Sequence, residues 1–420
     1  MVKKVSKKAA DGLKDYGLRS FSSLSVRNYR LYFGGQAISL SGTWLDTVAQ
    51  AWLILELTHS GTLLGLLAAA RFLPVLILGP YGGLIADSVN KRRLLYVTQT
   101  GAMILAFILA AIVVTNTVQV WMVFVLASCL GLINAVDSPT RQTFVMEMVG
   151  KEKLTNAISL NSIEVNIARI IGPVIAAALI AGVGLGWCFF INGLSYIAVL
   201  ICLKLMDGSE LLPSLPSARG KGRLRAGFFY VWHTPVLRNV LIIMALVGAL
   251  SYEFQVVLPL FATQTFGGNA GTYALMMTAM GLGSLIGGLF TASRGNPSPK
   301  RLLEATIALG ISMILTAITP DLPMALAALV LVGFCTISFT ALTNTTLQLN
   351  SVQDMRGRVM ALWVMAFLGS TPIGGPIIGY ISEHGSPRLG LAVGGLAALL
   401  SAVFGILALR NYRKKQSIPL

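Results

Sequence analysis

Polar side chains recur at helical spacing within an apolar stretch near the N-terminus. The five residues are separated by steps of three and four: Gln36, Ser39, Thr43, Asp46 and Gln50. On an α-helix they fall within about 80° of one another. Because a carboxylate exposed to lipid costs at least about 2.5 kcal/mol, this stripe must face a protein interior or a water-filled cavity. Asp46 is therefore the first candidate for binding a proton or a cation, and a structural acid paired with an arginine is the alternative.

Four more charged residues lie within apolar stretches, where charge is costly. Arg71 needs an acid, which Asp46 or Glu253 can supply. On an ideal helix Glu164 points about 140° away from Arg169, so Glu164 needs another partner or a cavity. Arg169 either holds helices together or contacts a substrate, and Glu253 either binds a proton or pairs with a cation.

These residues must be positioned by helices that cross a lipid bilayer. Hydrophobic residues make up 55% of the 420 and charged residues only 11%, whereas a soluble domain has about 25% charged residues. The apolar stretches are long and continuous, as in transmembrane helices, whereas β-barrel strands are short and alternating. The sequence predicts an all-α integral membrane protein with twelve spans at 31–55, 61–86, 94–115, 119–138, 157–181, 186–206, 238–262, 271–293, 301–319, 323–345, 358–382 and 389–409.

The positive charges are distributed as in a multi-pass protein with both termini in the cytoplasm. With that orientation, all but three of the 32 lysines and arginines lie in the tails or in inner loops, the exceptions being Arg71, Arg169 and Arg388. This is the positive-inside pattern. The net charge of +16 then reflects contact with anionic headgroups of the plasma (inner) membrane rather than a nucleic-acid partner.

Motifs for a cofactor, a metal ion or catalysis are absent from the sequence. The four cysteines lie within predicted spans without metal-ligand spacing, and His59, His233 and His384 are dispersed. The phosphate-binding motif of ATP-driven pumps and the motifs of zinc and serine hydrolases do not occur. We therefore expect no cofactor, no metal site and no enzymatic activity.

The chain contains an internal repeat. The segment 207–237 is rich in proline, glycine and cations and predicts a cytoplasmic linker. It divides the chain into six-helix halves at 31–206 and 238–409, with basic cytoplasmic tails at 1–30 and 410–420. "GGLIADSVNKRRLL" in the first half matches "GGLFTASRGNPSPKRLL" in the second.

A second pair of segments supports the repeat. Gly172-Pro173 and Gly375-Pro376 are separated by nearly the same offset as the first pair. Such repeats are typical of secondary transporters, which handle substrate near the midplane between the two halves.

The first repeated segment resembles the loop signature between the second and third spans of the major facilitator superfamily, G-x-x-x-D-(R/K)-x-G-(R/K)-(R/K). The matching residues are Gly83, Asp87, Lys91 and Arg92. The resemblance implies a conformational latch on the cytoplasmic side, in which Asp87 faces helix N-termini or the cations of its own loop. Asp137 and Arg141, where the fourth span reaches the cytoplasm, are expected to brace the same gate.

Other segments resemble one branch of this superfamily. "ARIIGPVIAA" at 168–177, which contains Gly172 and Pro173, resembles the antiporter signature G-x-x-x-G-P-x-x-G-G, and its small residues allow close helix packing. "NAVDSPTRQTFV", "LTNAISLNS" and "RGRVMAL" are similar to segments of the enterobactin-exporter-like and macrolide-efflux-like branch.

The resemblance implies a secondary active transporter. With the acids inside the spans it favours a proton-coupled exporter, an antiporter of small amphiphilic molecules or drugs that works by alternating access. A dedicated exporter of a siderophore or another metabolite is the alternative, and a permease subunit or a channel is the alternative from a different class. We expect protons as the coupling ion, a small-molecule substrate, a surrounding bilayer, no nucleic acid and a monomeric chain.

Overall fold

The computed structural model describes residues 21–212, 223–294 and 297–416, and every regular element in these ranges is helical. In chain order the elements are η1 (Ser22–Ser25), α2 (Arg27–Thr58), α3 (Gly61–Ser88), α4 (Lys91–Val114), α5 (Val120–Gly182), α6 (Leu185–Leu205), η2 (Gly208–Glu210), α7 (Arg223–His233), α8 (Pro235–Ser251), α9 (Phe254–Leu260), η3 (Phe261–Thr265), α10 (Ala270–Ser293), α11 (Pro299–Ala317), α12 (Leu322–Leu349), α13 (Gln353–Leu368), α14 (Thr371–His384) and α15 (Pro387–Gln416).

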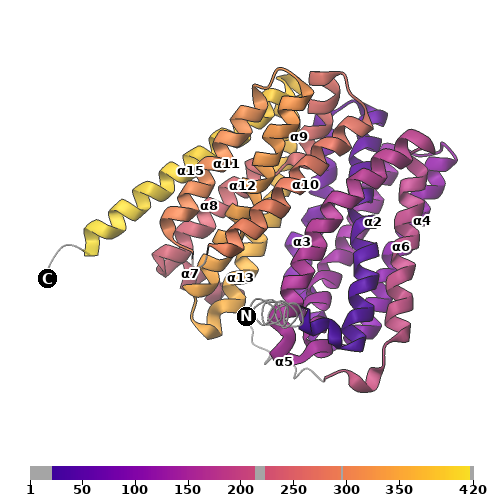
Figure 1. The fold of residues 1–420 in the computed structure, drawn as a ribbon, viewed down its shortest axis with the longest axis horizontal. Coiled ribbons are helices and arrows are strands. Elements are labelled where there is room, and N and C mark those ends of the chain that lie inside the picture. Colours follow the sequence, from indigo (N-terminus) through magenta and orange to yellow (C-terminus); the bar gives the residue numbers. More distant parts are fainter. Residues whose placement is uncertain (1–20, 213–222, 295–296, 417–420) are drawn as a thin grey trace, which may run out of the picture.

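The long helices form two groups that lie side by side (Figure 1). We name α2 to α6 the N-terminal group and α8 to α15 the C-terminal group. In the first, α2 and α3 pack on α5, and α4 packs on α6; in the second, α10 packs on α12, and α11 packs on α12 and α15. The two groups meet where α3 packs on α14 and α5 packs on α10.

The helices agree with the predicted membrane spans. Nine helical segments of the described ranges are long and apolar enough to cross a membrane, and one of them, α5, has 63 residues and covers two predicted spans. Two further helices, α2 and α11, carry polar or charged residues but have 32 and 19 residues. The all-helical membrane fold is confirmed, and a count of twelve spans is consistent with it.

The predicted linker and tails are described only in part. Within 207–237, η2 and α7 are helical, while residues 213–222 lie outside the described residues. The first 20 residues and residues 417–420 of the predicted tails also lie outside them. The division of the chain at this linker stays a prediction.

Two predicted spans are broken near their middles, which the sequence did not predict. The stretch 238–262 forms α8 and α9, with residues 252–253 outside regular helix. The stretch 358–382 forms α13 and α14, with a break at residues 369–370. A broken helix leaves backbone groups without intrahelical partners, and these are tolerated at membrane depth only inside protein or along a polar cavity.

The fourth and fifth predicted spans are joined in α5. Gly150, between them, has φ 70°, a left-handed conformation that glycine adopts without a steric penalty. The long element is therefore two helices joined at a kink.

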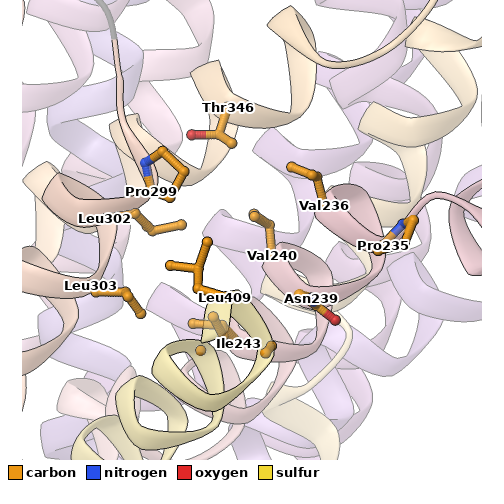
Figure 2. A pocket seen from close by; sticks show the side chains of 12 residues that line it. Pro235, Val236, Asn239, Val240, Ile243, Pro299, Leu302, Leu303, Thr346 and Leu409 are labelled. Carbon is orange, nitrogen blue, oxygen red and sulfur yellow. The ribbon is translucent and has the colours of Figure 1, made fainter. Parts of the chain in front are cut away.

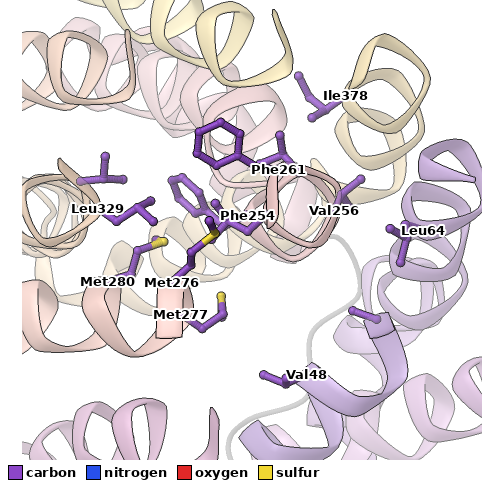
Figure 3. Packing of buried hydrophobic residues seen from close by; sticks show 14 of the residues in the cluster. Val48, Leu64, Phe254, Val256, Phe261, Met276, Met277, Met280, Leu329 and Ile378 are labelled. Atoms are coloured by element: carbon purple, nitrogen blue, oxygen red, sulfur yellow. The ribbon is translucent and has the colours of Figure 1, made fainter. Parts of the chain in front are cut away.

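One large buried apolar cluster includes residues of both groups. Figure 3 shows Leu64 of α3 beside Val256 of α9 and Ile378 of α14. Phe261 and Met276 continue the cluster within the C-terminal group. The contact between the groups is thus partly a hydrophobic one, which gives affinity without fixing a single geometry.

Glycine allows α3 to approach α5 closely. A Cβ atom at Gly82 would overlap the carbonyl oxygen of Ala135 on α5, whereas a Cβ at Gly83 would meet open space. Although Gly83 is the residue that matches the loop signature, packing therefore requires its neighbour Gly82.

This contrast predicts opposite effects of two alanine substitutions. Gly82→Ala should lower the apparent Tm of the purified protein, because overpacking costs about 1–3 kcal/mol. Gly83→Ala, the matched control, should leave it unchanged or raise it, because alanine gains about 0.5–1 kcal/mol over glycine within a helix. Thermal unfolding in detergent measures both variants, and equal destabilisation by the two would contradict the packing account.

Candidate functional site

Asp46 and Arg71 lie together inside the N-terminal group. Asp46 on α2 is 3% exposed, and its Oδ2 is 3.9 Å from Nη1 of Arg71 on α3. Asn192 of α6 also faces this carboxylate, but Oδ2 has no hydrogen-bond partner. Of the two acids that the sequence offered to Arg71, the structure places Asp46 beside it. The pair is loose, because its two atoms are 3.9 Å apart and Oδ2 of Asp46 accepts no hydrogen bond.

The remaining stripe residues of α2 are also shielded from lipid. Gln36, Ser39 and Gln50 are buried. The Thr43 hydroxyl donates to the carbonyl oxygen of Ser39 at 2.9 Å, so it bonds within its own helix. The stripe faces neighbouring helices along its whole length, and Asp46 carries its only charge.

A tight polar cluster joins α2, α4 and α5. Nε of Arg141 is 2.7 Å from Oδ2 of Asp137 one helical turn away. Oδ1 of Asp137 accepts from Thr98 at 2.6 Å and from Gln99 at 2.9 Å. Nη1 of Arg141 donates to Oε1 of Gln36 at 3.2 Å. These contacts of the charge pair brace three helices of the N-terminal group.

The two cations of the loop signature also bind within the N-terminal group. Lys91 is buried, and its Nζ is 2.7 Å from Oε1 of Glu147 on α5. Nε of Arg92 donates to the carbonyl oxygen of Leu203 at 2.9 Å, and its Nη2 donates to that of Met206 at 3.0 Å. A cation at a helix C-terminus compensates the free carbonyl groups there, so Arg92 caps α6.

The acid of the signature is not placed by the structure. Asp87 lies in the last turn of α3, and its side chain falls outside the described residues. Its role as a latch stays a prediction.

Just beyond α6, hydrogen bonds from the Ser209 side chain and backbone hold the pKa of the Asp207 carboxyl below its usual range.

Glu164 and Arg169 on α5 are not paired with each other. Glu164 is 5% exposed, its Oε1 has no hydrogen-bond partner, and Arg141 is its electrostatic neighbour. The Arg169 guanidinium lies over the Trp44 ring, with Cζ 4.9 Å from the ring centroid. The separation expected from helical geometry is therefore present.

Glu253 lies where the two helix breaks meet the N-terminal group. Its side chain is 5% exposed, faces Thr371 at the start of α14, and has an Oε1 without a hydrogen-bond partner. A Cβ at Gly375 would lie 3.4 Å from Oε2 of Glu253 and 2.9 Å from the carbonyl oxygen of Gly65 on α3. The carboxyl group thus lies beside the contact between α3 and α14.

Both glycine–proline pairs lie at close helix contacts. A Cβ at Gly172 would lie 2.5 Å from Cβ of Trp44 on α2, and Pro173 is buried in the same contact region. Gly375, followed by Pro376 within α14, lies against α3 as described. The first pair packs helices within the N-terminal group, and the second packs helices of different groups.

A carboxylate closes one end of the contact between the groups. Oε2 of Glu383, near the end of α14, accepts hydrogen bonds from the Ser60 hydroxyl at 2.9 Å and the Thr62 backbone N–H at 2.8 Å, and from the Thr62 hydroxyl. Ser60 is the N-cap of α3. A carboxylate at a helix N-terminus is favoured by the free N–H groups and the helix dipole, so Glu383 ties α14 to α3.

Sequence reasoning missed the partners that complete these contacts, namely Thr98, Gln99, Glu147, Asn192 and Glu383. The sequence carries a weak signal for one of them, because Ser60-Gly61-Thr62 is a typical helix start that attracts an acid. The acid that binds this helix start, Glu383, lies more than 300 residues away in the chain, so only the tertiary fold selects it.

A pocket in the C-terminal group contains none of the predicted site residues. It has an empty volume of about 520 Å³ and lies among α8, α11, α12 and α15. Figure 2 shows apolar side chains such as Leu302 and Val240 around it, with Asn239 and Thr346 as polar members. Among the described residues, no three histidine, cysteine, aspartate or glutamate side chains are arranged to hold a metal ion.

An all-helical membrane fold with charges enclosed between its helices is typical of membrane transporters. The family described as transmembrane secretion effector, within the major facilitator superfamily, matches residues 18–420. The chain therefore belongs to this family. It is a multi-pass membrane protein that transports small molecules and is not an enzyme.

Several curated proteins are similar along most of the chain. The staphyloferrin A transporter of Staphylococcus aureus is 25% identical over 82% of this chain and 87% of its own length. The multidrug efflux pump Tap of Mycolicibacterium fortuitum is 27% identical over 82% and 86%. The enterobactin exporter EntS of Shigella boydii is 23% identical over 93% and 94%.

Solved structures share the fold at lower identity. A bacterial homologue of the human lysosomal transporter Spinster, in an inward-facing and unoccupied conformation, has a TM-score of 0.74 at 16% identity and covers 94% of this chain and 98% of its own. A D-xylose–proton symporter has a TM-score of 0.72 at 12% identity and covers 89% and 97%. These likenesses show the fold alone.

Removing the charge of Glu383 should make the two groups separate more often at this end. Glu383→Gln removes the charge from three hydrogen bonds, and hydrogen bonds to charged groups are worth about 1.5–3 kcal/mol. We expect a larger population in which α3 and α14 are apart at this end. Spin labels at the exposed positions Leu57 and Tyr380, measured by pulsed electron resonance, report this as a longer distance.

The matched control is Glu56→Gln, which removes an exposed acid from the same end of α2. It should give the wild-type distance distribution. If Glu383→Gln also gave that distribution, Glu383 would not hold the two groups together.

Proposed function

We propose that this transporter is a proton-coupled secondary exporter of small amphiphilic molecules that works by alternating access. The observation that carries the proposal is the position of Glu253, a buried carboxyl beside the contact between α3 and α14. Alternating access requires the two groups to rock about a site near the midplane. This contact must then change, and with it the surroundings of Glu253.

A change of surroundings is what couples a proton to a conformational change. If a carboxyl group binds a proton more tightly in one state than in the other, protonation shifts the population toward that state. The position of Glu253 supports this role, because its neighbours Thr371 and Gly375 come from the helix that contacts the N-terminal group. Asp46, loosely paired with Arg71, is the second proton-binding candidate, and Glu164 is the third.

The contacts within the N-terminal group support a rigid unit. Asp137, Arg141, Lys91 and Arg92 all bind partners on α2, α4, α5 or α6. These residues therefore connect helices that move together, whereas Glu383 and Glu253 lie where the two groups meet. In this scheme Lys91 and Arg92 support the gate by fixing the loop, and Asp87 is the residue that responds to the opposite group.

We place both termini in the cytoplasm and the chain in the plasma (inner) membrane, because this orientation puts nearly all lysines and arginines on the inner side. The segment 207–237 then joins two halves, 31–206 and 238–409, on the cytoplasmic side. The end closed by Glu383 faces outward. The transporter acts as a monomer, with protons as its coupling ion and lipid around its helices.

The cargo has two candidate classes. The relative named as a multidrug efflux pump supports export of amphiphilic drugs. The relatives named for staphyloferrin A and enterobactin support the second candidate, a dedicated exporter of a siderophore or another metabolite. Both candidates use the same helices and the same proton-binding residues, so cargo binding distinguishes them.

Neutral variants of the two acids test the coupling. In proteoliposomes with an imposed pH gradient, Glu253→Gln and Asp46→Asn should each reduce gradient-driven transport of a fluorescent amphiphilic cation by tenfold or more, because neither amide can titrate. Exchange of cargo across the membrane without a gradient should persist in a variant whose only defect is the loss of its proton-binding group.

The control variant is Glu304→Gln, which removes an exposed acid paired with Lys300 on α11 and should transport at the wild-type rate. A catecholate siderophore, assayed beside the dye, tells the two cargo classes apart. Full gradient-driven transport by both acid variants would remove Asp46 and Glu253 from the mechanism.

A further inference from the structure

Arg169 has no protein counter-charge among the described residues. Two other arginines of the N-terminal group each have an acid, because Arg71 lies beside Asp46 and Arg141 beside Asp137. Arg169 forms no ion pair of this kind, and its buried Nε has no hydrogen-bond partner. A guanidinium that is largely withdrawn from water and lacks an anion is strongly disfavoured, so a negative charge from elsewhere would stabilise it.

The nearby acids do not fill this role. Glu164, on the same helix, has Arg141 as its electrostatic neighbour. Glu253 faces Thr371. The geometry therefore leaves a cation in the middle of α5 whose anion is not part of the described protein.

An aromatic ring holds the guanidinium from one side. Cζ of Arg169 lies 4.9 Å from the centroid of the Trp44 ring, and the Cβ of Trp44 packs against Gly172. Stacking on a ring recovers only a part of the lost hydration. It also leaves the edge of the planar guanidinium, with its fork of donors, oriented for a carboxylate.

The C-terminal group adds further aromatic surface. Tyr252, at the break between α8 and α9, interacts electrostatically with Arg169. Its hydroxyl is held by the carbonyl oxygen of Thr336 at 2.8 Å. Its ring meets Phe367 edge to face at 5.2 Å, and Phe367 stacks on Trp363 at 5.5 Å. These partly exposed rings form a continuous aromatic surface that begins beside Arg169.

We propose that Arg169 binds an anionic group of the cargo, while Trp44 and Tyr252 contact an aromatic body attached to it. The cargo class is then organic anions with a carboxylate or similar group on a conjugated ring system. The inference rests on the proposed function and adds to it the chemistry of the cargo. Because Arg169 and Trp44 belong to one helix group and Tyr252 to the other, this cargo binds between the groups.

Binding of two matched probes tests the proposal. The purified full chain in lipid nanodiscs is titrated with 2-naphthoate and 2-naphthamide, which share a ring system and differ in charge, by calorimetry. The wild type should bind naphthoate roughly 10- to 100-fold more tightly, the value of hydrogen bonds to a charged group. Arg169→Gln should abolish this preference without changing naphthamide affinity, and Arg169→Lys should keep part of it.

Arg238→Gln is the control, because Arg238 also lies over a tryptophan, at 5.9 Å from the Trp232 ring centroid, but outside the proposed site. It should keep the full preference. Equal affinity of the wild type for the two probes would overturn the inference, and this test needs no variant to fold. An Arg169→Gln variant that still prefers naphthoate would overturn it as well.

The outcome is separable from that of the proposed function. Arg169-dependent naphthoate binding without any gradient-driven transport would support the anion site and refute proton coupling. Gradient-driven transport with no preference for naphthoate would support coupling and refute the anion site.

Discussion

The cost of an ionised side chain inside a membrane is the constraint on which this structure depends. In low-dielectric surroundings a charge requires a counter-charge or several hydrogen bonds. Asp137 and Arg141 form an ion pair at 2.7 Å, and Asp137 also accepts hydrogen bonds from Thr98 and Gln99. Glu253 and Arg169 form no ion pair among the described residues, and each has a buried polar atom without a hydrogen-bond partner. The ion-paired charges hold helices together, and the unpaired ones are available to bind a proton or a cargo anion.

The second constraint is that the two helix groups must pack against each other and still be able to separate. α3 and α14 approach so closely at Gly65 and Gly375 that backbone touches backbone, which gives contact area without interlocking side chains. Glu383 adds a charged tie at one end of this contact. A contact built from glycine, apolar side chains and one carboxylate can separate and re-form, because few specific bonds are broken. Glu253 lies beside this contact, so its protonation can depend on whether the two groups are together or apart.

The amino-acid sequence was sufficient for the membrane fold and for the charged residues inside it, because apolar length and helical spacing are local properties. A buried arginine needs an acid, so Arg71 was predicted to pair with Asp46 or Glu253, and the structure places Asp46 beside it. The helix break at residues 252–253 was not predicted, since the stretch is apolar on both sides of it. The ties made by Glu383 and by Glu147 join residues far apart in the chain, and only the packing of helices selects such partners.

In the proposed exporter, protonation and cargo binding favour different states, and the central claim is that proton and cargo therefore compete. Cargo-induced proton release tests it most directly: cargo is added to the purified wild-type protein in weakly buffered solution, and a pH-sensitive dye follows the medium. The account predicts that cargo binding acidifies the medium, and that the release falls when Glu253 and Asp46 are both replaced by their amides. Cargo binding verified by calorimetry, without proton release at any pH between about 5 and 8, would contradict the claim.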